Sequence, residues 1–165
     1  MADITLQEIT AANWRATLAL GVHPAQQRFV ADCQPIAAIV LAKAYVGAGG
    51  MHWQPYAIAA KEQFIGMLAL AHAPDNPTDY WLFHFFIDQR WQGQGYGRAA
   101  LRAAVELVRA DYTHCQHIHL TVNPDNTPGQ RLYASVGFRP GGAQQHGELV
   151  YILDLAAPSS IADNS

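Results

Sequence analysis

The sequence predicts a single α/β domain in which a mixed sheet is flanked by helices. Apolar runs typical of strands alternate along the chain with segments of helical periodicity, and residues 80–87 have the aromatic and β-branched content of a buried central strand. The 165 residues suit one domain and are too few for two full domains. We expect the domain to cover residues 1–155 and residues 156–165 to form a flexible tail.

The first 50 residues predict one short strand and a helical arm. Residues 4–6 alternate as a strand, and Asn13 is expected to cap a helix that runs through Trp14 and Leu18 to about Gly21. Apolar positions between residues 29 and 45 then indicate one or two amphipathic helices, interrupted or begun at Pro35 and ended by residues 47–50.

Strands dominate the middle of the chain. Residues 56–59 and 64–70 are apolar runs joined by a polar turn at 61–63, which predicts a hairpin. The strand at 80–87 is expected to be buried on both faces, with one polar residue, His84, inside it. The remaining elements are a glycine-rich turn, a helix at about 97–110, a strand at 117–122, a short helix at about 130–135 and a strand at 148–155.

Charged residues are sparse, at 14% of the chain, and unevenly placed. Residues 1–89 hold four basic and seven acidic residues. Residues 90–139 hold six basic and three acidic residues, and residues 140–165 hold three acidic residues and no basic one. The net charge of −3 disfavours binding to nucleic acid, whereas a basic stretch between acidic ones suits an anionic ligand beside a cationic one. Two cysteines, no signal-peptide pattern and no apolar run near ~20 residues predict a soluble cytoplasmic protein that does not enter a membrane.

The glycine-rich turn at residues 93–97 is the strongest indication of function in the sequence. Gly93, Gly95 and Gly97 alternate between a strand and a helix, so that backbone amides can converge beside the positive end of the helix and bind phosphate. The spacing differs from the dinucleotide-binding G-x-G-x-x-G, and the Lys-Ser/Thr pair of a P-loop is missing. A flexible turn with glycine at a helix start is the plain alternative.

Two motifs make the sequence similar to the GNAT superfamily of N-acetyltransferases. Residues 92–97 fit the pyrophosphate-binding pattern Q/R-x-x-G-x-G/A, and residues 126–138 fit Asn-x-x-Ala-x-x-Leu-Tyr-x-x-x-Gly-Phe, with Gly129 where Ala is usual. The resemblance spans about residues 3–155 and implies a mostly antiparallel sheet. Residues 26–31, 80–83 and 87–93 are similar to runs of bacterial diamine and spermidine/spermine acetyltransferases, although Cys33, Ile36 and His84 depart from that subgroup.

The resemblance implies acetyl-CoA as co-substrate. Free backbone groups at the end of the central strand would pair with the pantetheine arm, and amides of residues 93–98 would hold the pyrophosphate, with Arg90, Arg98 or Arg131 adding positive charge. Tyr133 matches the tyrosine that protonates the leaving thiolate in many family members, and a purely structural aromatic is its alternative. The residues expected to bind acetyl-CoA are Phe85, Phe86, Ile87, Gln92, Gly93, Gln94, Gly95, Tyr96, Gly97, Arg98 and Asn126.

Transfer to an alkyl ammonium, with a pKa of ~10.4, requires a group that accepts its proton. His84 is the best side-chain candidate because its unperturbed pKa of ~6.5 suits proton transfer near neutrality. A histidine that only fills a buried polar spot, another base and a water relayed by backbone carbonyls stay open. Candidates for binding the acceptor are Asp32, Trp81 and His84, and Asp79 and Asp88 could help to attract a cation.

His114, Cys115, His117 and His119 include good zinc ligands, but their spacing lacks a second ligand-bearing element, so no metal is expected. The sequence therefore predicts an N-acetyltransferase that moves the acetyl group directly to a small primary amine, with diamines and polyamines among the candidates. The alternatives are a non-catalytic acyl-CoA-binding or sensing domain, and a related enzyme acting on an amino acid, an aminoglycoside or a peptide N-terminus. The expected partner is a small amine, and the resemblance suggests a homodimer.

Overall fold

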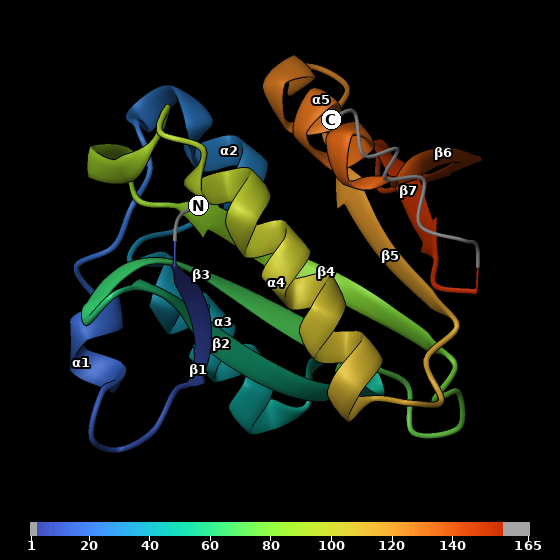
Figure 1. Ribbon diagram of the computed structural model, residues 1–165, viewed down its shortest axis with the longest axis horizontal. Coiled ribbons are helices and arrows are strands. Elements are labelled where there is room, and N and C mark those ends of the chain that lie inside the picture. The colour runs from blue at the N-terminus through green and yellow to red at the C-terminus, as the bar shows by residue number, and fades with distance from the viewer. Residues whose placement is uncertain (1–2, 157–165) are drawn as a thin grey trace.

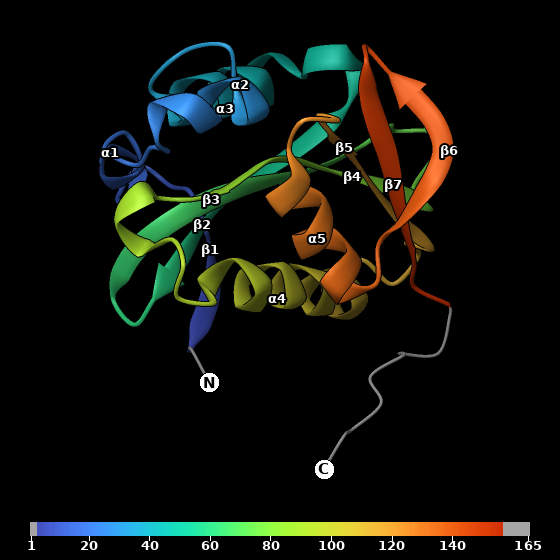
Figure 2. The ribbon, with the colours of Figure 1, turned by 90° about the horizontal axis from the view of Figure 1, so that it is seen from above.

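The computed structural model describes residues 3–156, which form one seven-stranded sheet with helices on both faces (Figures 1 and 2). The strand order is β1-β2-β3-β4-β5-β7-β6, and β4 and β5 are the parallel pair in an otherwise antiparallel sheet. The predicted mixed, mostly antiparallel sheet is confirmed. The strands are β1 (Ile4–Glu8), β2 (His52–Ala60), β3 (Gln63–His72), β4 (Asp79–Ile87), β5 (His117–Val122), β6 (Arg139–Gln145) and β7 (Glu148–Asp154).

The helices divide between the two faces of the sheet (Figure 2). One face carries α1 (Trp14–Thr17), α2 (Gln27–Val30) and α3 (Ile36–Val46), and the other carries α4 (Tyr96–Asp111) and α5 (Thr127–Val136). Three single turns of 3-10 helix, η1 (Pro24–Gln26), η2 (Ala48–Gly50) and η3 (Gln89–Trp91), lie in the connections.

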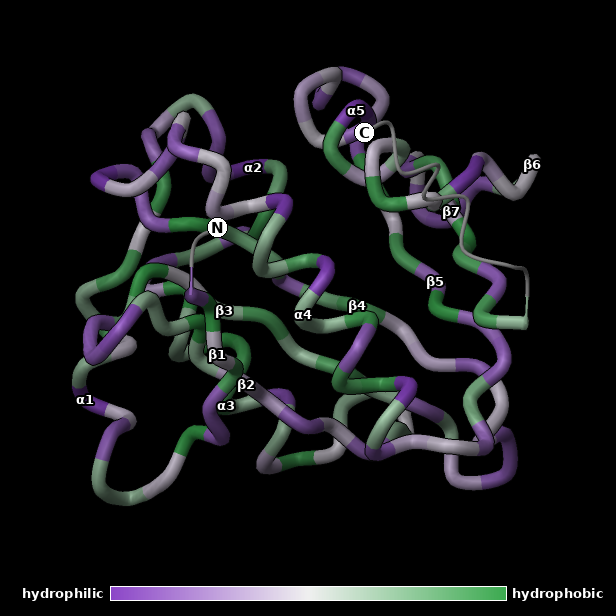
Figure 3. The backbone as a smooth tube through the Cα atoms, viewed as in Figure 1, coloured by the Kyte–Doolittle hydropathy of each residue, from purple (hydrophilic) through white to green (hydrophobic). Residues whose placement is uncertain are grey.

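Each face has its own hydrophobic core. Leu68, Leu101 and Leu120 belong to the core that the sheet shares with α4, whereas Ile36 and Val40 of α3 pack with Met67 in the second core. The buried positions of α4 recur every three or four residues, as its sequence predicts. Helices therefore cover both faces of the central strands, and Figure 3 shows β3 largely in the green of hydrophobic residues.

The helix expected to follow Asn13 is shorter than predicted, because α1 ends at Thr17. The Asn13 side chain does not cap it. Instead Asn13 Oδ1 accepts a hydrogen bond from the Thr10 amide (2.8 Å) and Nδ2 donates to the Glu8 carbonyl (3.0 Å), so this side chain closes the turn after β1.

Two strands differ from the sequence predictions. Strand β4 is not buried throughout on both faces, since residues 83–85 are half-buried. Strand β6 was not predicted, because all its residues are exposed and its Pro140, Gly141 and Gly142 give no alternating pattern. It pairs only with β7 and forms the edge of the sheet.

Within residues 3–156, no helix combines the length and apolar character that a membrane span needs. The predicted flexible tail falls, from residue 157 onward, outside the described residues.

Candidate active site

Strands β4 and β5 are paired only at their beginnings. The parallel register joins residues 79–81 to residues 117–119, and beyond Trp81 the two strands diverge (Figure 1). In the described part of the chain, residues 82–87 therefore have no strand partner on the side of β5. Free backbone groups of this kind can pair with an extended, amide-bearing ligand.

A bulge in β4 lies beside this open edge. Ala69 of β3 pairs with Phe83 and Met67 pairs with Phe86, so that one residue of β3 faces both His84 and Phe85. His84 has φ +52°, a left-handed conformation that costs a non-glycine residue roughly 1 kcal/mol. The extra residue shifts the alternation of side chains, so that Phe85 turns toward the core that contains α4.

Gly66 allows β3 to approach this bulge. A Cβ atom at Gly66 would overlap the Phe86 carbonyl oxygen and lie 3.2 Å from the Cα of Ile87. Only glycine fits at this position without moving the end of β4, so Gly66 fixes the place at which the strand leaves the sheet.

The turn after β4 is organised by Asp88. Its carboxylate, in a residue that is 1% exposed, accepts hydrogen bonds from the Gly21 amide (2.9 Å), the Arg90 amide (3.0 Å) and Arg90 Nε (2.7 Å). Burial opposes ionisation of Asp88, yet these hydrogen bonds and the charge of Arg90 lower its pKa overall. The carboxylate is thus committed to the turn and is not free to bind a cationic acceptor.

The glycines of the turn have two different functions. Gly93 and Gly95 have φ of +74° and +83°, which glycine adopts without strain, and Gly95 precedes the first turn of α4. Gly97 instead lies inside the helix, where an added Cβ would touch the Leu132 side chain of α5 at 3.4 Å. No side chain caps α4, so its first amides are free to face an anion.

Gln92 connects the turn to the helical arm. Gln92 Nε2 donates to Gln26 Oε1 (2.9 Å) and to the Ile87 carbonyl (2.9 Å), while Gln26 Nε2 donates to Gln92 Oε1 (3.0 Å). This exchange of hydrogen bonds fixes η1 and the end of β4 at one place.

Asn126 is the N-cap of α5. Its Oδ1 accepts a hydrogen bond from the Gly129 amide (3.0 Å), and a Cβ atom on residue 129 would lie 2.8 Å from Asn126 Cγ. The glycine that stands where the family pattern has alanine therefore makes room for this capping conformation. The Nδ2 group remains available as a donor to a ligand.

Tyr133 lies on α5 and packs on two aromatic rings, Phe85 of β4 at a centroid distance of 6.3 Å and Phe138 at 6.0 Å. Burial, assisted by the negative charge of Glu148, raises the pKa of Tyr133, so its hydroxyl is protonated at neutral pH. Among residues 3–156 the hydroxyl has no hydrogen-bond partner within range, which leaves its proton available to a ligand.

These elements surround a pocket of about 300 Å³. It lies where β4 leaves β5, and both motifs contribute to its wall. Eight of the predicted site residues line it together, namely Phe85, Phe86, Ile87, Gln92, Gly93, Gly97, Asn126 and Tyr133.

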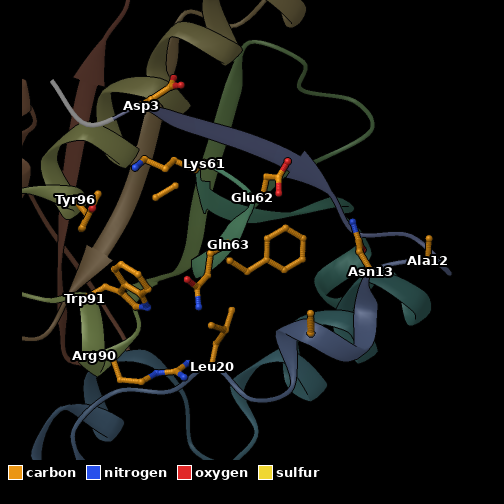
Figure 4. Close-up of a pocket in the computed structure, with 13 residues that line it drawn as sticks. Asp3, Ala12, Asn13, Leu20, Lys61, Glu62, Gln63, Arg90, Trp91 and Tyr96 are labelled. Carbon is orange, nitrogen blue, oxygen red and sulfur yellow. The ribbon is translucent and has the colours of Figure 1, made fainter.

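Other predicted residues lie outside this pocket. Gln94, Gly95 and Arg98 belong to the turn or to α4 without lining it, and Arg98 Nη2 donates to the Ser135 carbonyl at 3.5 Å. Tyr96 and Arg90 instead line a larger cavity of about 1190 Å³ between the turn, α1 and the β2–β3 hairpin (Figure 4). That cavity carries charges of both signs and contains neither Tyr133 nor Asn126.

Both ring nitrogens of His84 are engaged by the helical arm. Nδ1 lies 2.7 Å from the Val30 carbonyl, to which it donates, and Nε2 lies 2.9 Å from Nζ of Lys43. Burial lowers the pKa of His84, the hydrogen bond to Val30 opposes that shift, and the positive charge of Lys43 adds to it. His84 is therefore neutral at pH 7, and its side chain does not line the pocket.

The residues predicted to bind the acceptor amine do not lie together. Asp32 is exposed in the segment after α2, close enough to His84 for its charge to raise the pKa of that ring. The ring of Trp81 stacks on His119 (4.9 Å) and packs near Phe83 (6.1 Å). Neither residue lines the pocket.

Asp79 has two histidine partners. Its Oδ1 lies 3.0 Å from Nδ1 of His117 and 3.0 Å from Nε2 of His119. These hydrogen bonds, led by that from His119, lower the pKa of Asp79 to about 2. Cys115, which the sequence places beside them, is a buried thiol whose pKa is raised by burial to about 11.

The sequence comparison identifies the family to which this fold belongs. The chain matches the acetyltransferase (GNAT) family over residues 32–138, and it belongs to that family. The predicted resemblance is thereby confirmed.

Individual relatives agree with this assignment. The chain is 29% identical, over 110 residues, to the spermine/spermidine N(1)-acetyltransferase of Bacillus subtilis strain 168, covering 63% of this chain and 72% of the relative. Among solved structures, AAC(6')-Ib in complex with paromomycin and acetyl-CoA superposes with a TM-score of 0.78 at 17% identity, covering 99% of both chains. Spermidine N-acetyltransferase from Vibrio cholerae, in complex with CoA and spermine, superposes with a TM-score of 0.67 at 16% identity, covering 90% of this chain and 92% of that structure.

Sequence reasoning missed three contributors to the site. Gly66 and Lys43 act on β4 from neighbouring elements, and Gln26 reaches Gln92 across 66 positions of the chain. None of them lies in a motif. The run that includes Gln26 was part of the resemblance to the polyamine enzymes, which was the one available signal.

Proposed function

We propose that this chain transfers the acetyl group of acetyl-CoA directly to a small primary amine, with diamines and polyamines as the first candidates. The observation that carries the proposal is the pocket in which the free edge of β4, the uncapped start of α4, Asn126 and Tyr133 meet. The name of the Bacillus subtilis relative supports the acceptor class.

Residues of this chain would hold acetyl-CoA at three places. Backbone groups of residues 85–87 would pair with the pantetheine arm, Asn126 Nδ2 would donate to the same arm, and amides of residues 93–98 would bind the pyrophosphate. The residues that line the pocket are uncharged, which suits the uncharged pantetheine arm, and the uncapped start of α4 would face the phosphates. Acetyl-CoA, when bound, supplies the activated acetyl group and a thiolate leaving group.

Tyr133 would donate its proton to the departing sulfur. Its raised pKa keeps the phenol protonated, and its position on α5, beside Phe85, places it at the wall of the pocket. A general acid positioned in this way contributes roughly 10²–10⁴-fold to a rate.

The proton of the acceptor ammonium would leave through water rather than directly to His84. Nδ1 of His84 already donates to Val30, and Nε2 faces the Lys43 ammonium, so neither nitrogen offers a free lone pair to an acceptor. This arrangement supports the water relay that the sequence left open and makes His84 a residue that positions the bulge. His84→Asn, which tolerates left-handed backbone, should then keep kcat within about tenfold, whereas a direct base would lose far more.

The charges near His84 suggest how a diamine would lie. Lys43 and Asp32 both act electrostatically on His84, with opposite signs. A second ammonium group of the acceptor would therefore extend toward Asp32 and away from Lys43. Asp32→Asn should raise KM for a diamine and leave KM for a monoamine unchanged.

The deciding experiment measures thiol release from acetyl-CoA with the full-length chain. The acceptors would be monoamines, diamines, spermidine, spermine, amino acids, an aminoglycoside and a peptide N-terminus. We expect diamines or polyamines to accelerate release most. Acceleration only by another class would overturn the proposed acceptor, and no acceleration despite tight binding of acetyl-CoA would overturn the proposed reaction.

A further inference from the structure

The side chains of Asp79, His117 and His119 form a cluster that the acetyl-transfer site does not use. One ligand atom of each residue lies within 4.8 Å of those of the other two. The cluster joins the first residues of β4 and β5, at the closed end of the gap that forms the pocket. Spacing alone could not reveal it, because Asp79 is 38 positions from His117.

The geometry of the cluster fits a bound metal ion. Two ligands held about 2.1 Å from one zinc ion, at roughly 90–110° to each other, lie about 3.0–3.4 Å apart. Asp79 Oδ1 is 3.0 Å from the nearest nitrogen of each histidine. The three groups thus need little movement to close around an ion.

The surroundings hold each ligand in place. The parallel register pairs Asp79 with His117 and Trp81 with His119, so all three ligands sit on rigid strands and on one face of the sheet. The Trp81 ring stacks on His119, and the second oxygen of Asp79 accepts hydrogen bonds from Asn76 Nδ2 (2.9 Å) and Thr78 Oγ1 (3.3 Å). Such outer contacts orient ligands in metal sites.

The exposure of the cluster is also suitable. The side chains of His117, Asp79 and His119 are 39%, 28% and 18% exposed, so water can complete the coordination.

We propose that Asp79, His117 and His119 bind one divalent transition-metal ion of the zinc class, which clamps the first residues of β4 and β5 together. Two imidazoles and one carboxylate suit Zn²⁺, Co²⁺ and Ni²⁺ better than Mg²⁺ or Ca²⁺. The clamp is separate from acetyl transfer and stands independently of the proposed acceptor.

The test titrates Zn²⁺ into the chelator-treated full-length chain, free of any affinity tag, by calorimetry, and follows Co²⁺ binding by its visible absorption. We expect one saturable ion per chain and a higher Tm with Zn²⁺. His117→Gln and Asp79→Asn should weaken binding by more than about tenfold and abolish the Co²⁺ spectrum. His114→Gln, an exposed residue of the same segment, should bind like the unchanged chain.

Absence of saturable binding would overturn the proposal, and so would equal affinity in His117→Gln and the unchanged chain. An equal loss of Zn²⁺ affinity in His114→Gln would also overturn the proposal, because it would indicate that surface histidines in general bind the ion. Circular dichroism of the metal-free variants checks that each is folded. If Asp79→Asn does not fold, His117→Gln decides the test, because the side chain of His117 is half-exposed and its replacement disturbs the packing little.

Discussion

The hydroxyl of Tyr133 is the one group in the pocket whose proposed chemistry can be removed without changing the packing. Tyr133→Phe keeps the ring against Phe85 and Phe138. We expect kcat to fall by roughly 10²-fold or more, with little change in the affinity for acetyl-CoA. Steady-state thiol release and equilibrium binding measure the two quantities. Tyr45→Phe, at a residue that is 93% exposed, is the control, and a full rate in Tyr133→Phe would remove the tyrosine from the reaction.

Lys43 should set the pH at which His84 becomes charged. The positive charge of Lys43 contributes to the lowered pKa of His84, so Lys43→Met should raise that pKa, while Lys43→Arg keeps the charge. Protonation of His84 would place a buried positive charge in the bulge that shapes the pocket. The acidic limb of the pH–rate profile should therefore move to higher pH in Lys43→Met alone. If both variants keep the profile of the unchanged chain, another group controls that limb.

At the scale of single elements, β4 depends on Gly66. A methyl group at this position would overlap the Phe86 carbonyl, so Gly66→Ala should lower the free energy of unfolding by about 1–3 kcal/mol and disturb the pocket. Urea unfolding gives the stability. Gly21→Ala is the matched control, since an added Cβ there meets nothing within 4 Å, and an equal loss in both variants would contradict the importance of the close approach.

Helix α5 allows two functions of Asn126 to be separated. Asn126→Ala removes the N-cap and should cost about 1 kcal/mol of stability, whereas Asn126→Asp retains an oxygen that accepts from the Gly129 amide. Both substitutions remove the Nδ2 donor and should weaken binding of acetyl-CoA. Chemical unfolding and calorimetry measure the two effects, and full affinity in Asn126→Asp would show that Nδ2 does not contact the ligand.

For the molecule as a whole, acid stability should depend on Asp79. Its pKa is about 2 in the folded chain and ~3.9 in an unfolded one, so the folded state binds fewer protons in this range. The stabilisation is complete above about pH 5 and is lost as the pH falls toward 2. Thermal unfolding between pH 5 and 2 should show a shallower loss for Asp79→Asn than for the exposed control Asp75→Asn. Parallel curves would contradict this.

The sequence predicted those parts of the fold whose determining contacts are local. The helical period of α4, the alternation of β5 and the glycines at 93 and 95 each depend on neighbours within a few positions, and each was predicted. The pocket residues of the two motifs came from the resemblance. Strand β6 was missed because its residues are all exposed and include a proline and two glycines, and among the described residues it pairs only with β7.

The contacts that His84, Asp88 and Asp79 make with other elements could not be predicted, because those partners lie 38–67 positions away. Burial decides the chemistry of such residues. The fold gives both ring nitrogens of His84 and the carboxylate of Asp88 hydrogen-bond partners that the sequence did not indicate, and the part of His84 in proton transfer stays a prediction. The homodimer suggested by the resemblance stays a prediction, for which the exposed Tyr45 and Val46 at the end of α3 are natural first sites of mutation.

The reciprocal amide contact between Gln26 and Gln92 has a consequence for protein engineering. An attempt to change acceptor selectivity by grafting the segment between β1 and β2 from a relative would also replace the partner of the glycine turn. The same graft would replace Lys43 and the backbone around Val30, which face the two ring nitrogens of His84. A chimera should therefore exchange these positions together with residues 84 and 92, so that the new acceptor segment arrives with the contacts that shape the donor pocket.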